Sequence, residues 1–184
     1  AYAPPAPDYA KASPFASILR EEEANGRYIP PVGEGDHDWM SKPLPEHVFS
    51  SAEQKCLAEG IYFEARGEDV KGQAAVGQVI LNRVRNPAYP STICGVVYQG
   101  HMKPGCQFSF TCDGKTDTPR NDAQWAQAQS IAKRITNGEL WLPEVGYSTF
   151  YHANYVSPGW AGRMNKIDRI GRHIFYKKRN EKPY

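Results

Sequence analysis

The hydrophobic pattern of this chain changes its period once, near residue 148. Before that point apolar residues recur every three to four positions, as in Val76, Val79, Ile80 and Val84, which is the spacing of a buried helix face. After it come short segments rich in aromatic and branched residues, which are expected to be strands: 148–152, 166–170 and 173–177. Helices followed by a small antiparallel sheet near the C-terminus indicate an α+β fold.

Helices are expected at 45–65, 70–85, 92–98 and 118–137. The first has Pro45 in its first turn, where the missing amide hydrogen is not needed. The second ends before Asn86-Pro87, because the residue preceding a proline is disfavoured in the helical conformation. The last begins at Thr118-Pro119, where threonine supplies a cap and proline takes the first helical position.

Residues 1–44 differ from the rest because they are rich in proline and poor in aliphatic side chains. Such a segment buries little apolar surface, so we expect an extended arm or linker with one short helix at about 14–25. The compact domain is then expected to span residues 45–184. An arm of this kind is ordered by its own packing or by another molecule, so a protein partner is a candidate.

The charge balance disfavours some classes of partner. The formal net charge is only +2, whereas a dedicated nucleic-acid binder usually carries a basic face and a higher isoelectric point. No stretch of about 18 apolar residues occurs, so no membrane span is expected. The N-terminus also lacks the apolar core of a secretory signal. Either a signal was removed ahead of Ala1, or the chain reaches its site of action by another route.

The chain has four cysteines, Cys56, Cys94, Cys106 and Cys112, which allow three disulfide pairings. Close spacing favours Cys106 with Cys112, and Cys56 with Cys94 would then tie two helices together. A zinc site formed by the second pair with His101 competes with this interpretation, but its spacing differs from the common zinc patterns. Four buried free thiols are the remaining alternative.

Glu64 is an unusual residue for its position in the first long helix. It shares a helix face with Leu57 and Ile61, so a carboxyl group stands at the end of an apolar stripe. Burial would raise its pKa and let it donate a proton near neutral pH. Spacing alone nevertheless favours a helix-end glutamate that reaches solvent or pairs with Arg66 or Arg83.

Two further acids, Glu68 and Asp69, follow Gly67 at the turn into the second helix. Acids at this position interact favourably with the positive end of a helix. We therefore interpret both as structural rather than catalytic.

Several ordered blocks of the chain resemble the spore cortex-lytic / cell-wall hydrolase family of bacteria. The likeness covers about residues 50–178 and leaves out the arm at 1–44. The blocks are IYFEARGE at 61–68, GQAAV at 72–76, VILNRV at 79–84, ICGVVY at 93–98, CQFSF at 106–110, DG at 113–114, FYHA at 150–153, PGW at 158–160 and GRHIFY at 171–176.

The resemblance implies a lysozyme-like α+β domain that acts on peptidoglycan, with Glu64 as the catalytic residue and with no metal or other cofactor. Such enzymes are regarded as lytic transglycosylases or muramidases, which cut between N-acetylmuramic acid and N-acetylglucosamine. In the transglycosylase route the acid protonates the bridging oxygen. Acting then as a base, it helps the 6-hydroxyl of muramic acid close onto C1, and no water attacks.

That route fits the lack of a clear second carboxylate. Most glycosidases need two, but the candidates Asp113 and Asp168 fall in turn-like sequence, where a turn role is commoner. Polar and aromatic side chains suit a glycan cleft. The candidate substrate-binding residues are Gln107, Ser109, Tyr151, His152, Asn154 and Trp160. Alternatively, the aromatic members pack the core and the histidine satisfies a backbone group.

Peptidoglycan is thus the expected partner, and the expected location is the cell envelope, after signal removal, or a virion or endolysin. A competing hypothesis is a non-catalytic wall-binding or structural module of a phage particle or envelope assembly. An amidase or peptidase is disfavoured, because these usually need zinc or a Cys-His pair and no cysteine has an obvious histidine partner.

Overall fold

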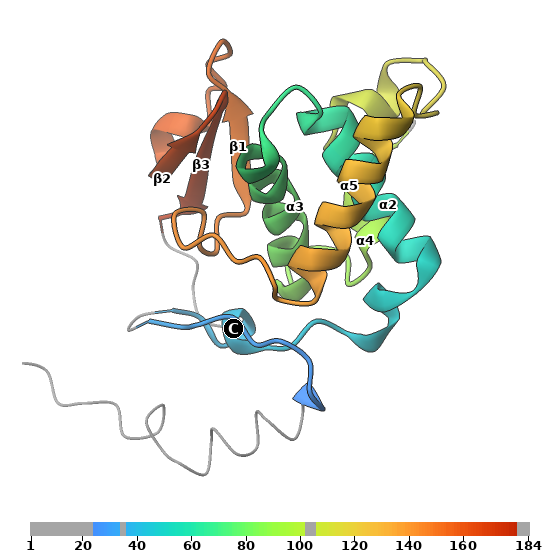
Figure 1. The fold of residues 1–184 in the computed structure, drawn as a ribbon. Coiled ribbons are helices and arrows are strands. Elements are labelled where there is room, and N and C mark those ends of the chain that lie inside the picture. The colour runs from blue at the N-terminus through green and yellow to red at the C-terminus, as the bar shows by residue number, and fades with distance from the viewer. Residues whose placement is uncertain (1–23, 34–35, 102–105, 180–184) are drawn as a thin grey trace, which may run out of the picture.

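The computed structural model describes residues 24–33, 36–101 and 106–179, and it shows a helical body with a three-stranded sheet at one side (Figure 1). The order of elements confirms the predicted α+β fold. The α-helices are α2 (Ser51–Ala65), α3 (Val70–Arg85), α4 (Ile93–Val97) and α5 (Asp122–Thr136). The strands are β1 (Phe150–Ala153), β2 (Met164–Ile170) and β3 (His173–Lys178). Short 3-10 turns are η1 (Asp38–Ser41), η2 (Glu46–Phe49), η3 (Ser109–Cys112) and η4 (Ala161–Arg163).

Two helices begin later than the sequence predicted, and a side-chain cap explains each start. Ser50 has extended backbone angles and its hydroxyl accepts from the amide of Glu53, so α2 begins at residue 51 and Pro45 precedes only the turn η2. Asn121 accepts from the amide of Gln124 at 2.9 Å and starts α5. Serine and asparagine are strong caps, and they prevail here over the upstream prolines.

Helix α3 has the predicted bounds and lies at the centre of the molecule, between α2, α5 and the sheet (Figure 1). Asp69 caps it by accepting from the amide of Gly72 at 2.7 Å, as its structural interpretation predicted. Every residue from Gly72 to Arg85 is buried. The side-chain nitrogens of Gln78 and Asn82 donate to carbonyls between residues 142 and 148, which fixes the loop that leads into β1.

The sheet has the antiparallel order β1-β3-β2, and its β2–β3 turn contains Gly171 at φ +56°. Tyr151 of β1 lies opposite Phe175 of β3, and both contribute to a core cluster against α3. Side chains alternate between the two faces of a strand. Phe150 and His152, the neighbours of Tyr151, therefore point to the face of the sheet away from that cluster.

The described residues before position 45 pack against the domain. Leu44 belongs to the main core, and Trp39 and Met40 cluster with Tyr147. Buried Arg85 donates to the carbonyl of Lys42 at 3.2 Å. The packed unit thus extends upstream of the predicted boundary at 44/45. Most of the expected short helix at 14–25, and with it the question of a protein partner, lies outside the described residues.

Both favoured disulfides are present. Cys56–Cys94 ties α2 to α4, and Cys106–Cys112 closes a short loop. Within the described ranges, none of the helices combines the length and apolar character that crossing a bilayer requires.

Candidate active site

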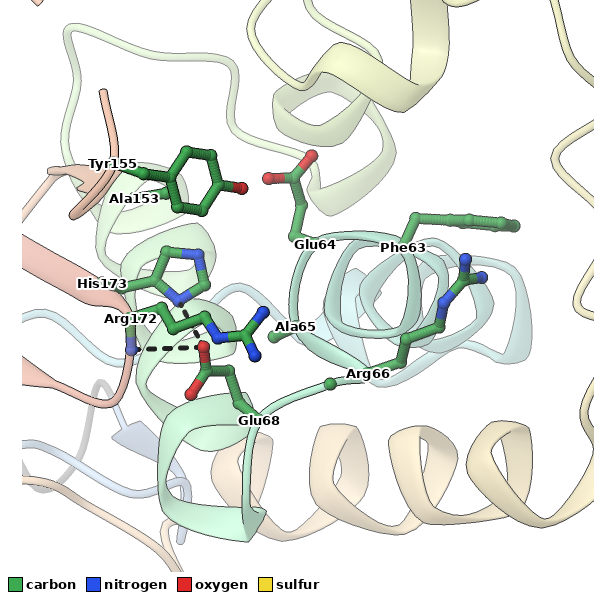
Figure 2. A pocket seen from close by; sticks show the side chains of 10 residues that line it. Phe63, Glu64, Ala65, Arg66, Glu68, Ala153, Tyr155, Arg172 and His173 are labelled. Carbon is green, nitrogen blue, oxygen red and sulfur yellow. Dashed lines mark hydrogen bonds and ion pairs between the residues drawn. The ribbon is translucent and has the colours of Figure 1, made fainter. Parts of the chain in front are cut away.

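Glu64 stands in the last turn of α2, beside a pocket of about 120 Å³ between the α2–α3 corner and the sheet. Figure 2 shows its carboxyl group and the ring of Tyr155 pointing toward one another. We call this the Glu64 pocket. Its lining residues are Phe63, Glu64, Ala65, Arg66, Gly67, Glu68, Ala153, Tyr155, Arg172 and His173.

The Glu64 carboxyl is tuned by opposing effects. Burial raises its pKa, while a hydrogen bond from Tyr151 and the positive charge of Arg83 lower it in part, and the net shift is upward. The Tyr151 hydroxyl donates to Oε2 at 2.9 Å. Burial and the neighbouring carboxylate raise the pKa of Tyr151 well above its usual value, so this phenol keeps its proton and remains a donor.

Neither of the ion pairs considered for Glu64 forms among the described residues. Arg66 lies over the ring of Tyr62, with 5.1 Å from its guanidinium carbon to the ring centroid. Arg83 is buried, and its Nε donates to the carbonyl of Thr149 at 2.8 Å. Arg83 therefore anchors the start of β1, from which Tyr151 reaches Glu64.

Gln107 contributes to the same anchor. With its amide oxygen facing Arg83, Gln107 accepts from Nη1 and Nη2 at 3.1 and 3.2 Å. The guanidinium is also enclosed by aromatic rings, with centroids 5.3 to 5.7 Å away: Tyr89, Phe108 and Phe150. A buried cation held in this way is a fixed positive charge behind the carboxyl group.

Glu68 lines the Glu64 pocket but is engaged by the β2–β3 turn. Its Oε1 accepts from the amide of Arg172 at 3.2 Å and lies 3.9 Å from Nδ1 of His173 (Figure 2). A Cβ built on Gly171 would meet Oε2 at 2.0 Å, so the Glu68 carboxylate would have to shift to admit any other residue there. The carboxylate of Glu68 is thus engaged by a turn about a hundred residues away, a contact that the predicted role at the start of α3 did not include.

The other sequence candidates are spread over four places. Tyr151 and Gln107 act around Glu64 as described. The backbone N–H of Asn154 donates to the carbonyl of Arg172 at 2.7 Å, beside residues that line the pocket. His152 and Trp160 lie on the far face of the sheet, where the histidine hydrogen-bonds to the Tyr176 hydroxyl at 2.8 Å. Ser109 is exposed at the start of η3.

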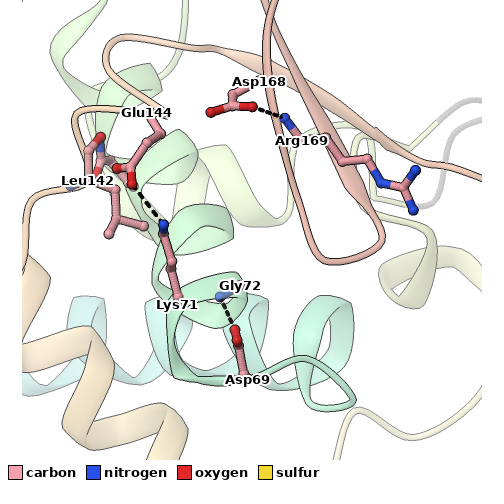
Figure 3. A network of polar contacts seen from close by, with 8 residues as sticks. Asp69, Lys71, Gly72, Leu142, Glu144, Asp168 and Arg169 are labelled. Carbon is pink, nitrogen blue, oxygen red and sulfur yellow. Dashed lines mark hydrogen bonds and ion pairs between the residues drawn. The ribbon is translucent and has the colours of Figure 1, made fainter.

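Neither candidate for a second carboxylate lines the Glu64 pocket. Asp113 accepts from the amide of Lys115 at 2.9 Å, and Asp168 accepts from the amide of Arg169 at 2.7 Å (Figure 3). Asp113 has the turn role expected of its sequence context, whereas Asp168 lies within β2, beside an irregularity in the pairing with β3, and not in the expected turn. The structure instead adds Tyr155, Arg172 and His173 to the pocket. The last two fall in a matched block of the sequence, yet no pattern there signalled that they would face Glu64.

The fold and the site together define a lysozyme-like α+β domain with a partly buried carboxyl group, that of Glu64, at a helix end beside a pocket. The family model "Cell Wall Hydrolase" matches residues 67–176. The chain belongs to the cell wall hydrolase family. The matched range begins three residues after Glu64.

Curated relatives carry the name spore cortex-lytic enzyme. The chain is 31% identical to the one from Oceanobacillus iheyensis over 129 residues, 70% of this chain and 43% of that protein. It is also 31% identical to the one from Bacillus subtilis over 127 residues, 69% of this chain and 38% of that protein. The chain therefore spans less than half the length of these two relatives.

Two solved structures share the fold. The catalytic domain of the germination-specific lytic transglycosylase SleB from Bacillus anthracis is 30% identical, with a TM-score of 0.59 over 72% of this chain and 99% of that one. The catalytic domain of the Bacillus cereus SleB protein is 29% identical, with a TM-score of 0.59 over 78% and 99% of the two chains. Their match confirms the predicted fold.

Proposed function

We propose that this chain cleaves the glycan strands of peptidoglycan as a lytic transglycosylase, with Glu64 as both acid and base. The observation that carries the proposal is a carboxyl group of raised pKa, held by Tyr151 at a pocket whose other carboxylate is already engaged. The relatives named spore cortex-lytic enzyme and lytic transglycosylase support the same activity.

The first step uses Glu64 as an acid. Because Tyr151 donates to Oε2, the proton of the neutral carboxyl is expected on Oε1. Glu64 transfers this proton to the oxygen that links N-acetylmuramic acid to N-acetylglucosamine, and the bond from C1 to that oxygen breaks. Tyr151 and the charge of Arg83 stabilise the carboxylate that is left.

The second step uses the same group as a base. The Glu64 carboxylate accepts the proton of the muramic acid 6-hydroxyl while the 6-oxygen of the sugar bonds to C1. This step gives a 1,6-anhydro end and restores the protonated Glu64. The route consumes no water and needs no second carboxylate. A hydrolytic route would need another base, and Glu68 is held by the amide of Arg172.

The same proposal places the activity outside the cytoplasmic membrane, in the cell envelope or beyond it. Peptidoglycan lies there, and the two disulfides, Cys56–Cys94 and Cys106–Cys112, are bonds that persist in oxidising compartments. A role as a non-catalytic wall-binding module is less well supported, because binding alone gives no reason for a carboxyl of raised pKa beside a pocket.

The test is digestion of purified peptidoglycan with the chain and with its Glu64→Gln variant, followed by mass spectrometry of the soluble products. We expect anhydro-muramic ends from the parent chain and no soluble products from Glu64→Gln. The exposed Glu46→Gln is the matched control and should behave like the parent. Reducing muramic acid ends would show that the chain is a hydrolysing muramidase and not a transglycosylase. Release of soluble products by Glu64→Gln would show that Glu64 is not the catalytic residue.

A further inference from the structure

A second pocket, of about 420 Å³, lies between the N-terminal half of α2 and the C-terminal half of α5. We call it the α2–α5 pocket. It is lined by Phe49, Ser51, Gln54, Lys55, Gln129, Lys133, Thr136 and Asn137, and it shares no residue with the Glu64 pocket. Gln54 and Glu64 are ten residues apart on α2, which is about 15 Å along a helix. The two pockets are therefore separate sites.

The walls of the α2–α5 pocket are joined by hydrogen bonds. Gln54 Nε2 donates to the carbonyl of Val48 at 2.9 Å and to Thr136 Oγ1 at 3.0 Å. Thr136 in turn donates to the carbonyl of Ala132 at 2.7 Å. These contacts link η2, α2 and α5, so the pocket is preformed. Its volume lies within the range of about 300–1,000 Å³ that is usual for small-molecule sites.

The lining carries positive charge only. Within the described part of the chain, its two charged residues are Lys55 and Lys133, and no carboxylate lines it. Lys55 is exposed and lies 3.7 Å from Glu59, a buried carboxylate that does not itself line the pocket. The described residues give Lys133 no ion pair. The pocket is therefore suited to a ligand that carries a carboxylate.

The uncharged lining points to the rest of the ligand. Ser51, Gln129 and Asn137 are exposed and offer hydroxyl and amide groups, which match sugar hydroxyls and N-acetyl groups. Phe49 is 39% exposed, which is high for a phenylalanine, and it presents an aromatic surface at the pocket. Aromatic surfaces pack against the apolar faces of sugar rings. Cations, amides and an aromatic ring together suit an acidic amino sugar.

We propose that the α2–α5 pocket is a second, non-catalytic glycan site, which binds a carboxylate-bearing disaccharide unit of the wall polymer. The identity of that polymer rests on the proposed function. Such a site holds the insoluble polymer near the enzyme and raises the effective concentration of glycan at the Glu64 pocket. It affects the insoluble substrate more than short fragments, which occupy only one site at a time.

The first test measures binding to insoluble peptidoglycan by co-sedimentation in the Glu64→Gln background. We compare Lys55→Ala/Lys133→Ala with Lys42→Ala/Lys166→Ala, which removes the same charge from exposed positions outside both pockets. The pocket variant should bind about tenfold more weakly, and the control should bind like its parent. Equal binding by the two double variants would overturn the proposal.

The second test identifies the ligand by NMR of backbone amides. A soluble muropeptide disaccharide, which carries carboxylates, should cause saturable shifts at Ser51, Thr136 and Asn137, and neutral chitotetraose should bind more weakly. Equal affinity for both probes, or no shifts at these amides, contradicts the acidic-sugar assignment. Neither test measures cleavage. Lysis by Glu64→Gln would thus count against the proposed catalytic role alone, while the binding comparison would still decide on the second site.

Discussion

The Tyr151 hydroxyl donates a hydrogen bond of 2.9 Å to Oε2 of Glu64, from a strand 87 residues further along the chain. Burial raises the pKa of this carboxyl, whereas the hydrogen bond from the Tyr151 phenol favours the ionised form of Glu64 and lowers that pKa in part. Glu64 thus stays protonated to a higher pH than an ordinary glutamate. Once it has lost its proton, the Tyr151 hydroxyl is already in place to stabilise the carboxylate. This arrangement suits a group that acts first as an acid and then as a base.

Replacement of Tyr151 by phenylalanine should separate these two effects. The hydrogen bond lowers the pKa of Glu64, so its loss should raise that pKa further and move the basic limb of the kcat/KM profile to higher pH. The rate at the optimum should fall roughly tenfold or more, because the carboxylate formed loses a charge-assisted bond. The measurement is release of soluble muropeptides as a function of pH.

The matched control is Tyr147→Phe, which removes a buried phenol that donates to the carbonyl of Pro31 outside the Glu64 pocket. It should leave the pH profile unchanged. A basic limb that moves to lower pH in Tyr151→Phe would contradict the role given to the hydrogen bond.

Glu64→Gln should be more stable than the parent chain at neutral pH. The folded-state pKa of Glu64 is raised, so the stability that its proton contributes is present below the unfolded pKa and is lost as pH rises through the folded pKa. Above that pH the parent holds a half-buried carboxylate, whereas glutamine stays neutral. Denaturant midpoints at about pH 8 should therefore favour the variant, and the difference should shrink toward about pH 4.

The control for this prediction is the exposed Glu46→Gln, whose midpoint should follow the parent at both pH values. If Glu64→Gln were equally destabilised at both, the carboxyl would contribute packing or hydrogen bonds rather than a buried charge.

Local signals explain which elements the sequence predicted well. Helix α3 has a cap at Asp69 and a stop at Asn86-Pro87, so both ends were marked and both were correct. The start of α2 was predicted too early, because Pro45 and Ser50 are both good starting residues and sequence alone does not rank them. Glu64 could be singled out because a carboxyl group ended an apolar stripe.

Tertiary contacts explain the remainder of the site. Glu68 could not be tied to the turn at Arg172, because nothing in its local sequence refers to a hairpin about a hundred residues away. The case of His152 is different. Its neighbour Tyr151 faces Glu64, so the period of a strand already places His152 on the other face, and the two could not both line one pocket.

Gly171→Ala should destabilise the protein and reduce its activity, because two costs combine at this turn. The left-handed φ of +56° disfavours alanine by about 1 kcal/mol. The new Cβ would also meet Oε2 of Glu68 at 2.0 Å, so the carboxylate would have to move away from the Arg172 amide, and loss of that hydrogen bond should add about 1 kcal/mol. Gly114→Ala is the matched control, since Gly114 has φ +73° and nothing within 4 Å of its built Cβ.

A double-mutant cycle isolates the clash. In a Glu68→Ala background, Gly171→Ala should cost about as much as Gly114→Ala does in the parent, because only the backbone strain remains. Urea unfolding gives all four free energies of unfolding. If Gly171→Ala and Gly114→Ala were equally costly in the parent chain, the contact between Glu68 and the turn would have no energetic weight.

The two disulfides should differ in their contribution to stability. Cys56–Cys94 closes a loop of 38 residues between α2 and α4, and Cys106–Cys112 closes one of 6 residues. Loop-closure entropy predicts losses of about 4 and about 2 kcal/mol when each pair is replaced by serine. Urea unfolding of the two double variants checks the order. A larger loss from the short loop would show that local packing, rather than restriction of the unfolded chain, gives these bonds their effect.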